Sequence, residues 1–197
     1  MNRLIISIIV CVLTIIPVFA QNLSEDEVIA TMSRAFELHK AKRYAEALEA
    51  FLIVGSNVDA NNSEVERQVY VCSQTMACAC HYSIEQYTKG YQLAKKLLSG
   101  KLADSEKEDI YHYYVLNGYM IACDFIQTDE NGNAEYPRGR ELLLEIAPYA
   151  DEELKGYVLP KIPLTWYFEG ASCFEKQMFE EALVCFNNAF NGFQELG

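Results

Sequence analysis

Cysteine and histidine come close together at one point of the sequence, the run Cys78-Ala79-Cys80-His81. Thiolate and imidazole groups at short spacing can bind Zn²⁺. Zinc ligands on one helix must lie three or four residues apart, and the chain has no second pair with the spacing of a structural zinc site. We therefore expect these side chains to be buried packing residues and predict no metal site.

The polar run TDENGNAE over residues 128–135 has the composition of the centre of a calcium-binding loop. With Gly132 as the sixth loop residue, the first position is Gln127 and the twelfth is Arg138. A calcium loop needs an Asp at its start and a bidentate Glu at its end. Both are missing, so we expect a polar turn built on the Asn-Gly pair.

Catalytic chemistry has little support in the sequence. The chain has three histidines, His39, His81 and His112, and none stands at a spacing that would identify a general base beside a nucleophile. It has no glycine-rich phosphate loop and no H-E-x-x-H motif. We predict no catalytic residue and no cofactor. An enzyme is an alternative that rests only on the histidine and cysteine content.

The composition limits the class of protein and its partners. The chain has 197 residues, of which 51% are hydrophobic, which excludes a disordered chain. Its 10 glycines and 5 prolines are too few for an all-β chain with many tight turns. A formal net charge of −12 repels phosphate backbones and anionic lipid surfaces, so we expect no nucleic acid partner.

The first twenty residues have the pattern of a secretory signal peptide. Arg3 precedes an uncharged apolar run over residues 4–19, and the small residues Val18 and Ala20 stand where a signal peptidase reads. The run is shorter than the roughly 20 residues that a membrane span needs. We predict cleavage after Ala20 and export to the periplasm or the medium. A retained membrane anchor is the alternative.

Six cysteines follow the predicted leader: Cys72, Cys78, Cys80, Cys123, Cys173 and Cys185. Six cysteines in an exported chain could form a disulfide framework. However, a chain of this length can build its core without disulfides, and most of the six stand among apolar neighbours in helical patterns. We expect free, buried thiols. If one bridge exists, we expect it between Cys173 and Cys185, which belong to one predicted helix pair.

From Ser24 onward the apolar residues recur with a helical period, and no stretch alternates with period two. Three Ser-x-x-Glu capping boxes mark helix starts at nearly equal spacing: Ser24 with Glu27, Ser63 with Glu66, and Ser105 with Glu108. Equivalent helix starts at nearly equal spacing indicate an internal repeat.

Two segments near the ends of the chain, 31–51 and 166–186, align without gaps. Small residues coincide at Ala35 with Gly170 and at Ala47 with Ala182, and large residues coincide at Tyr44 with Phe179, Leu48 with Leu183 and Phe51 with Phe186. This pattern resembles the tetratricopeptide repeat, a pair of antiparallel helices. The last unit has the repeat's signature residues at Trp166, Gly170, Phe179, Ala182, Phe186 and Ala189. The first unit has them at Ala35, Tyr44, Ala47 and Phe51, and departs from the signature at Thr31 and Val54.

The resemblance implies about four units, over residues 28–61, 71–104, 111–155 and 163–196. The two middle units are weaker, and the third needs extra residues between its helices, which the run 128–135 supplies. In such repeats, small residues let the paired helices approach closely. One pair cannot bury both of its faces, so the units stack into a right-handed superhelix, an α-solenoid.

In this family the first helix of each unit lines a concave groove. Carried onto this chain, the resemblance gives candidate groove residues Met32, Phe36, His39, Tyr82, His112, Tyr119, Tyr167 and Phe174. Relatives that clamp a partner's C-terminal carboxylate have Lys and Asn where this chain has Met32 and Phe36, so we expect no such clamp. An apolar, aromatic groove suits an amphipathic helix or a hydrophobic peptide. The alternative is a tight superhelix in which these side chains pack on each other.

Repeat arrays normally end with a helix whose outer face is polar. Here the last predicted helix, about residues 179–194, has Phe186, Phe190 and Phe193 on neighbouring turns. We predict that this face is covered by another protein, by self-association or by further sequence after Gly197.

The sequence thus predicts an exported all-α protein, with a leader over residues 1–20 and a helical repeat domain over 21–197. We expect a non-catalytic scaffold that binds a protein or peptide and touches the membrane only through an uncleaved leader. Two alternatives stay open. One is the sensory or docking ectodomain of a longer signalling protein. The other is a glycan-binding protein, because the chain's 13 tyrosines could stack on sugar rings.

Overall fold

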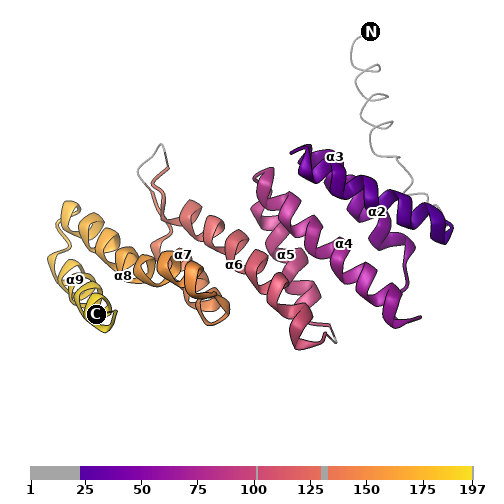
Figure 1. Cartoon of the computed structure of the whole chain (residues 1–197). Coiled ribbons are helices and arrows are strands. Elements are labelled where there is room, and N and C mark those ends of the chain that lie inside the picture. Colours follow the sequence, from indigo (N-terminus) through magenta and orange to yellow (C-terminus); the bar gives the residue numbers. More distant parts are fainter. Residues whose placement is uncertain (1–22, 101, 130–132, 197) are drawn as a thin grey trace, which may run out of the picture.

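The computed structural model describes residues 23–100, 102–129 and 133–196. Within these ranges the regular structure is helical and contains no strand, which confirms the predicted all-α class. The helices form an elongated row that runs from α2 and α3 at one end to α8 and α9 at the other (Figure 1). The predicted leader lies outside the described residues.

Each α-helix packs on the next one along the chain, and α4 also packs on α6 and α6 on α8. The α-helices are α2 (Glu25–Lys40), α3 (Tyr44–Asn57), α4 (Glu64–Ser83), α5 (Tyr87–Leu98), α6 (Asp104–Ile126), α7 (Tyr136–Ile146), α8 (Glu152–Glu175) and α9 (Phe179–Glu195). A short 3₁₀ turn, η1 (Ala147–Tyr149), follows α7.

The first two predicted capping boxes mark helix starts. At α2 the Ser24 side chain accepts a hydrogen bond from the Glu27 amide, and the Glu27 carboxylate accepts one from the Ser24 amide at 2.8 Å. At α4 the Ser63 hydroxyl accepts from the Glu66 amide at 3.1 Å, but the Glu66 carboxylate turns to the Asp59 amide at 3.0 Å. The second box is therefore only half formed.

The third predicted box is wrong. Helix α6 begins at Asp104, and the carboxylate of Glu106 accepts a hydrogen bond from the Ala103 amide at 2.7 Å. Ser105 and Glu108 therefore lie inside the helix. The physical reason is a tertiary contact, because Glu106 is also paired with Arg67 of α4, which fixes the helix start two residues earlier.

The same turn joins the two helices of three pairs. Its middle residue has a left-handed backbone at Lys42, Glu85 and Gln177, with φ of 60°, 60° and 61°. In each turn this residue donates its N–H to the carbonyl three residues earlier, at 2.9, 3.1 and 3.0 Å respectively. This is a left-handed helix end, made here without glycine. The pair α6 and α7 differs, because the longer segment 127–135 joins its helices.

The small residues of the repeat signature lie at close helix contacts. Ala35 and Ala47 are fully buried, and a Cβ atom on Gly170 would stand 2.9 Å from the Phe186 ring. Gly90 of α5 has its nearest neighbour on the next pair. A Cβ atom there would stand 2.4 Å from Oδ1 of Asn117 on α6, because α5 packs on α6 as well as on α4.

Two clusters of buried apolar side chains hold the row together. The N-terminal cluster joins α2, α3 and α4 around the fully buried Phe51. The central cluster extends from α4 to α8 around Leu143. Helix α4 contributes Ala77 and Cys80 to the first cluster and Val71 and Cys78 to the second.

The first helix of the last pair is longer than the repeat pattern implies. The predicted fourth unit starts at residue 163, whereas α8 already begins at Glu152. Asp151 caps it by accepting a hydrogen bond from the Leu154 amide at 2.8 Å. The helix continues through Pro160 and Pro163.

Candidate binding surface

The eight predicted groove residues lie on the first helices of the four pairs: Met32, Phe36 and His39 on α2, Tyr82 on α4, His112 and Tyr119 on α6, and Tyr167 and Phe174 on α8. Phe36, Tyr167 and Phe174 are exposed, and the other five are half-buried. All eight therefore have some accessible surface.

Several of these aromatic side chains contact the second helix of their own pair. Phe36 meets Phe51 with ring centroids 5.2 Å apart, and Phe174 meets Phe179 at 5.5 Å. His39 with Tyr44 and Tyr82 with Tyr87 make the same type of contact across the repeated turn. These contacts differ from the predicted alternative, in which the groove side chains pack on each other, because each one joins a groove residue to the second helix of its own pair.

Two predicted groove residues have structural partners. Tyr119 packs against the central cluster, and burial, followed by the neighbouring Cys123 thiol, raises its pKa to about 12. His112 places Nδ1 3.1 Å from a carboxylate oxygen of Asp151, the residue that caps α8. Hydrogen bonds from the Leu154 amide and then from His112 lower the pKa of Asp151. His112 thus joins α6 to the start of α8.

A depression of about 450 Å³ lies between the starts of α2 and α4. Its apolar lining residues are Leu23, Val28, Ile29, Val58, Val65 and Val69, with Glu25 and Glu66 among the polar ones. Ile29 and Val65 are 57% and 68% exposed. The repeat pattern missed Val65 and Val69, because it begins the second unit at residue 71. The capping box at Ser63 was the signal that these residues belong to a helix.

A second depression, of about 360 Å³, lies between α4 and α6. Its lining residues are Gln68, Val71, Cys72, Thr75 and Met76 from α4, and Ser105, Glu106, Asp109 and Tyr113 from α6. The two depressions are connected along α4 by a stripe at helical spacing, Val65, Val69, Cys72 and Met76. Val65 and Val69 line the first depression, and Cys72 and Met76 line the second.

A third feature is a tyrosine cluster formed by residues of α5, α6 and η1. Tyr111 stacks on Tyr149 with centroids 4.8 Å apart, and Tyr91 stacks on Tyr114 at 4.9 Å. Glu145 accepts hydrogen bonds from Tyr91 at 2.9 Å and from Tyr114 at 2.8 Å. The pKa of Glu145 is lowered, chiefly by the hydrogen bond from Lys95. A depression of about 310 Å³ opens beside Tyr111, Tyr149 and Lys95.

The cysteine–histidine run is divided between the two clusters. Cys78 belongs to the central cluster and Cys80 to the N-terminal cluster, and burial raises the pKa of both thiols to about 12. Burial also lowers the pKa of His81. Thiols in this state stay protonated, whereas metal binding needs thiolate. Across the described ranges, no group of three or more His, Cys, Asp and Glu side chains is placed to hold a metal ion.

All six cysteines after residue 20 are free thiols, including Cys173 and Cys185. Cys78, Cys80 and Cys185 are buried as predicted, but Cys123 and Cys173 are only half-buried. Cys72 is exposed, because it lies in the stripe of α4 between the two depressions. The Asn131-Gly132 pair of the predicted polar turn lies outside the described residues. Next to it, the side chain of Asp129 accepts a hydrogen bond from the Asn133 amide at 2.8 Å.

A buried arginine joins α7 to α8. The guanidinium of Arg140 lies over the Trp166 ring, 3.2 Å from its centroid, and donates to Glu169 at 2.9 Å and to Thr165 at 3.2 Å. The repeat pattern assigned Trp166 to packing but did not identify its cationic partner. That partner lies on the preceding pair, 26 positions earlier, where no local spacing indicates it.

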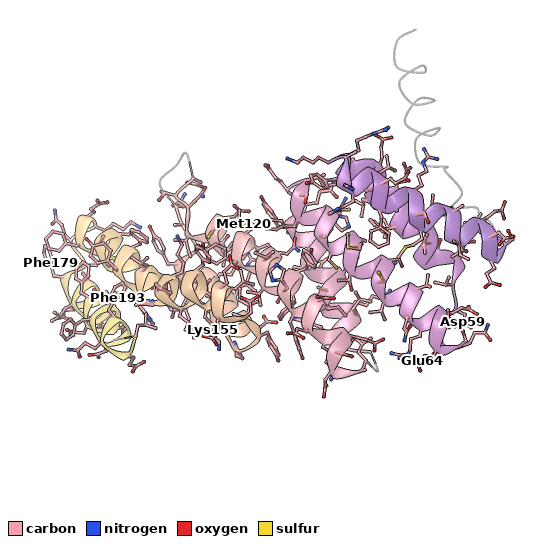
Figure 2. All side chains as sticks on the ribbon, in the orientation of Figure 1. Asp59, Glu64, Met120, Lys155, Phe179 and Phe193 are labelled. Atoms are coloured by element: carbon pink, nitrogen blue, oxygen red, sulfur yellow. The ribbon has the colours of Figure 1, made fainter. Side chains whose placement is uncertain are left out.

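The far end of the row has the exposed apolar face predicted for the last helix. Leu183, Phe190 and Phe193 of α9 are 62%, 61% and 41% exposed, whereas Phe186 is half-buried against Gly170. Figure 2 shows Phe179 and Phe193 on this terminal pair. None of the helices within the described ranges combines the length and apolar character needed to cross a bilayer.

Comparisons of the chain with protein-family models, with curated proteins and with solved structures find no match.

Proposed function

We propose that this chain is a non-catalytic binding scaffold that takes up a peptide along its first helices. The observation that carries this proposal is the stripe Val65, Val69, Cys72 and Met76 of α4, which connects a depression on each side of the helix. Val65 of the stripe and Ile29, which lines the same depression, are 68% and 57% exposed. Such a surface is typical of a binding site.

The spacing of the depressions suggests the form of the peptide. From Val65 to Cys72 is seven residues of helix, or about 10 Å at 1.5 Å per residue. Two anchors about 10 Å apart correspond to positions i and i+7 of an amphipathic helix, or to positions i and i+3 of an extended peptide. Helix-in-groove recognition uses anchors of this kind. We propose the helical form, because a partner helix can pack its apolar face along side chains that follow one face of α4 at helical spacing.

The proposal includes a tetratricopeptide-like solenoid as the scaffold. The turn that recurs at Lys42, Glu85 and Gln177 and the buried small residues of the first and last pairs support it. In such an array the first helices line one surface and leave it free for a partner. Export across the membrane is part of the same proposal and rests on the leader over residues 1–20. The ectodomain of a longer signalling protein remains the main alternative.

The test is selection of peptides from a displayed library on purified residues 21–197. We expect peptides with two apolar anchors, whose affinity falls at least about tenfold in an Ile29→Glu, Val65→Glu variant, because each change places a charge in the apolar depression. The matched control is Leu144→Glu on α7, a side chain that is 54% exposed but lies outside the depressions. Equal binding by all three proteins would contradict the proposal.

A second candidate function is glycan binding, favoured by the tyrosine cluster and the depression of about 310 Å³ beside it. Tyr149 is 44% exposed and offers an aromatic face, and Lys95 and Glu145 offer hydrogen-bonding groups at the same place. A glycan array probed with the intact protein and with Tyr149→Ala tests this candidate. Glycan binding that Tyr149→Ala abolishes, and that Ile29→Glu leaves unchanged, would support it.

A further inference from the structure

In the first three pairs of the row, the second helix is covered by the first helix of the next pair. Tyr91, the fifth residue of α5, stacks on Tyr114 of α6. Arg140, the fifth residue of α7, lies under the Trp166 ring of α8. The fifth residue of α9 is Leu183, which is 62% exposed. Among the described residues no further pair follows α9, so the corresponding face of this helix is open.

This open face is a stripe of large apolar side chains. Its members are Phe179, Leu183, Phe186, Phe190 and Phe193, at spacings that alternate between four and three residues. Such spacing is that of the a and d positions of a helix that pairs with another helix. The buried residues of α9, which pack toward α8, lie about a quarter turn away around the helix: Ala182, Cys185 and Ala189. Helices with two apolar faces placed in this way are typical of four-helix bundles.

The stripe continues onto α8. The Phe174 ring meets Phe179 with centroids 5.5 Å apart, and the Tyr167 ring meets Phe186 at 5.8 Å. We call the stripe together with Tyr167 and Phe174 the terminal patch; Phe179 and Phe193 mark the ends of its stripe (Figure 2). At about 200 Å² for each fully exposed side chain, the accessible part of the terminal patch is about 650 Å². Apolar patches of this size mark interaction sites.

The residue types of the stripe do not suit a further pair of the same repeat. The positions equivalent to Phe190 in the three earlier pairs have smaller residues: Gly55, Leu98 and Ala147. At Gly55 a Cβ atom would collide with the amide of Gln74, because α4 approaches α3 closely there. An exposed phenylalanine ring at this position keeps a neighbouring helix further away. A helix with its own a and d stripe can interdigitate with such rings, and α9 is itself a helix of this kind.

We propose that the terminal patch binds the terminal patch of a second copy of this chain, and that the two α9 helices pack antiparallel in a two-fold dimer. Covering the patch on both copies buries about 1,300 Å² in total, which lies within the roughly 1,200–2,000 Å² of stable, specific interfaces. The same patch serves both copies, so the contact closes on itself at two chains. This inference goes beyond the proposed function, because the peptide surface on α4 lies on other helices.

The charges of α9 favour the antiparallel direction. Glu180 and Glu181 lie in its first turn, and its last turn has no basic residue to pair with them. Parallel packing would bring the four carboxylates of two copies to one end of the dimer. Antiparallel packing separates them by about 20 Å along the helices, well beyond the screening length of about 8 Å at physiological salt.

Sedimentation of purified residues 21–197 tests the dimer with two neighbouring residues of α9. Leu183 lies in the stripe, and Val184 lies outside it but is 58% exposed, so both side chains can be changed without disturbing the core. We expect a wild-type dimer with a dissociation constant in the micromolar range or below. Leu183→Lys should raise this constant at least about tenfold, because it places a charge in an apolar contact, and Val184→Lys should change it less than about twofold. Circular dichroism checks that both variants keep their helices.

Cross-linking tests the direction of packing. Asn187 stands beside the middle of the stripe and Gln194 beside its end, and both are exposed. In an antiparallel dimer, mild oxidation should link Asn187→Cys to its own counterpart, whereas Gln194→Cys should give no more covalent dimer than the wild-type chain, in which Cys72 is exposed.

Three results would overturn the inference. A wild-type chain that stays monomeric up to about 100 μM would show that a second copy does not cover the terminal patch. A dimer that Leu183→Lys leaves intact would place the interface elsewhere. Equal cross-linking of Asn187→Cys and Gln194→Cys would show parallel packing.

Discussion

The sharpest test of the packing is a pair of identical substitutions, Gly90→Ala in α5 and Gly156→Ala in α8. A Cβ atom at Gly90 would stand 2.4 Å from Oδ1 of Asn117 and 2.7 Å from its Cγ. Asn117 is fully buried and donates to the Tyr113 carbonyl at 2.8 Å, so it cannot move aside without losing this hydrogen bond. At Gly156 nothing lies within 4 Å of the new Cβ atom.

The expected magnitudes have opposite signs. Alanine is favoured over glycine inside a helix by about 1 kcal/mol, and this gain applies to both positions. At Gly156 nothing opposes it, so the free energy of unfolding should rise by about 0.5–1 kcal/mol. At Gly90 the overpacking costs about 1–3 kcal/mol and the lost hydrogen bond about 1 kcal/mol more, so the variant should be destabilised by about 1–3 kcal/mol.

Urea denaturation gives the free energy of unfolding of each variant and thermal unfolding gives its melting temperature, both followed by circular dichroism. The melting temperature should fall by several degrees in Gly90→Ala and rise by about 1–4 °C in Gly156→Ala. The double variant Gly90→Ala, Asn117→Ala should be no less stable than Asn117→Ala alone, because removal of the amide makes room for the methyl group. Stabilisation by Gly90→Ala, or simple additivity with Asn117→Ala, would refute the assigned contact between α5 and α6.

Four further outcomes are expected. Gln177→Gly should raise the free energy of unfolding by about 0.5–1 kcal/mol in urea denaturation, because glycine adopts its positive φ without strain; a loss of stability would contradict the left-handed turn. Burial lowers the pKa of His81 from 6.5, so the unfolded chain binds the proton more readily and stability should fall as pH drops below about 6.5. His81→Gln should flatten this part of the stability–pH curve, and an unchanged slope would rule out His81 as its source. Arg140→Ala should destabilise the chain by about 2–4 kcal/mol in the same denaturation assay, because it removes the contact with the Trp166 ring and leaves Glu169 unpaired. Unchanged stability would show that this contact contributes nothing. The exposed face of α9 should make residues 21–197 bind a hydrophobic dye or self-associate in sedimentation, and Phe190→Lys should reduce either effect; a monomer that binds no dye would exclude an exposed face.

The parts of the fold that the sequence predicted are those governed by local spacing. Apolar residues at helical spacing follow directly from 3.6 residues per turn, so the all-α class could be predicted. Ser24 and Glu27 form their capping box because both partners lie within one turn. The burial of Ala35 and Ala47 follows from local spacing too, because the length of the turn between the two helices fixes which residues of one helix face the other.

What the sequence did not predict depends on contacts between distant residues. The start of α6 is set by the contact with Arg67 of α4, and Arg140 contacts Trp166 on the next pair. Neither contact produces a periodic pattern in the sequence. The depressions beside α4 depend on how α2, α4 and α6 cross, which spacing within one helix does not fix. Among the predicted groove residues, Tyr119 and His112 have structural partners for the same reason.

Helix α4 gives side chains to both the N-terminal and the central cluster. It is therefore the shared wall of two cores, and a shift of this one helix must repack both. The surface proposed to hold a peptide lies on the same helix. A peptide bound to α4 is therefore placed to stiffen both clusters. Binding at this one surface can then affect helices on either side of α4.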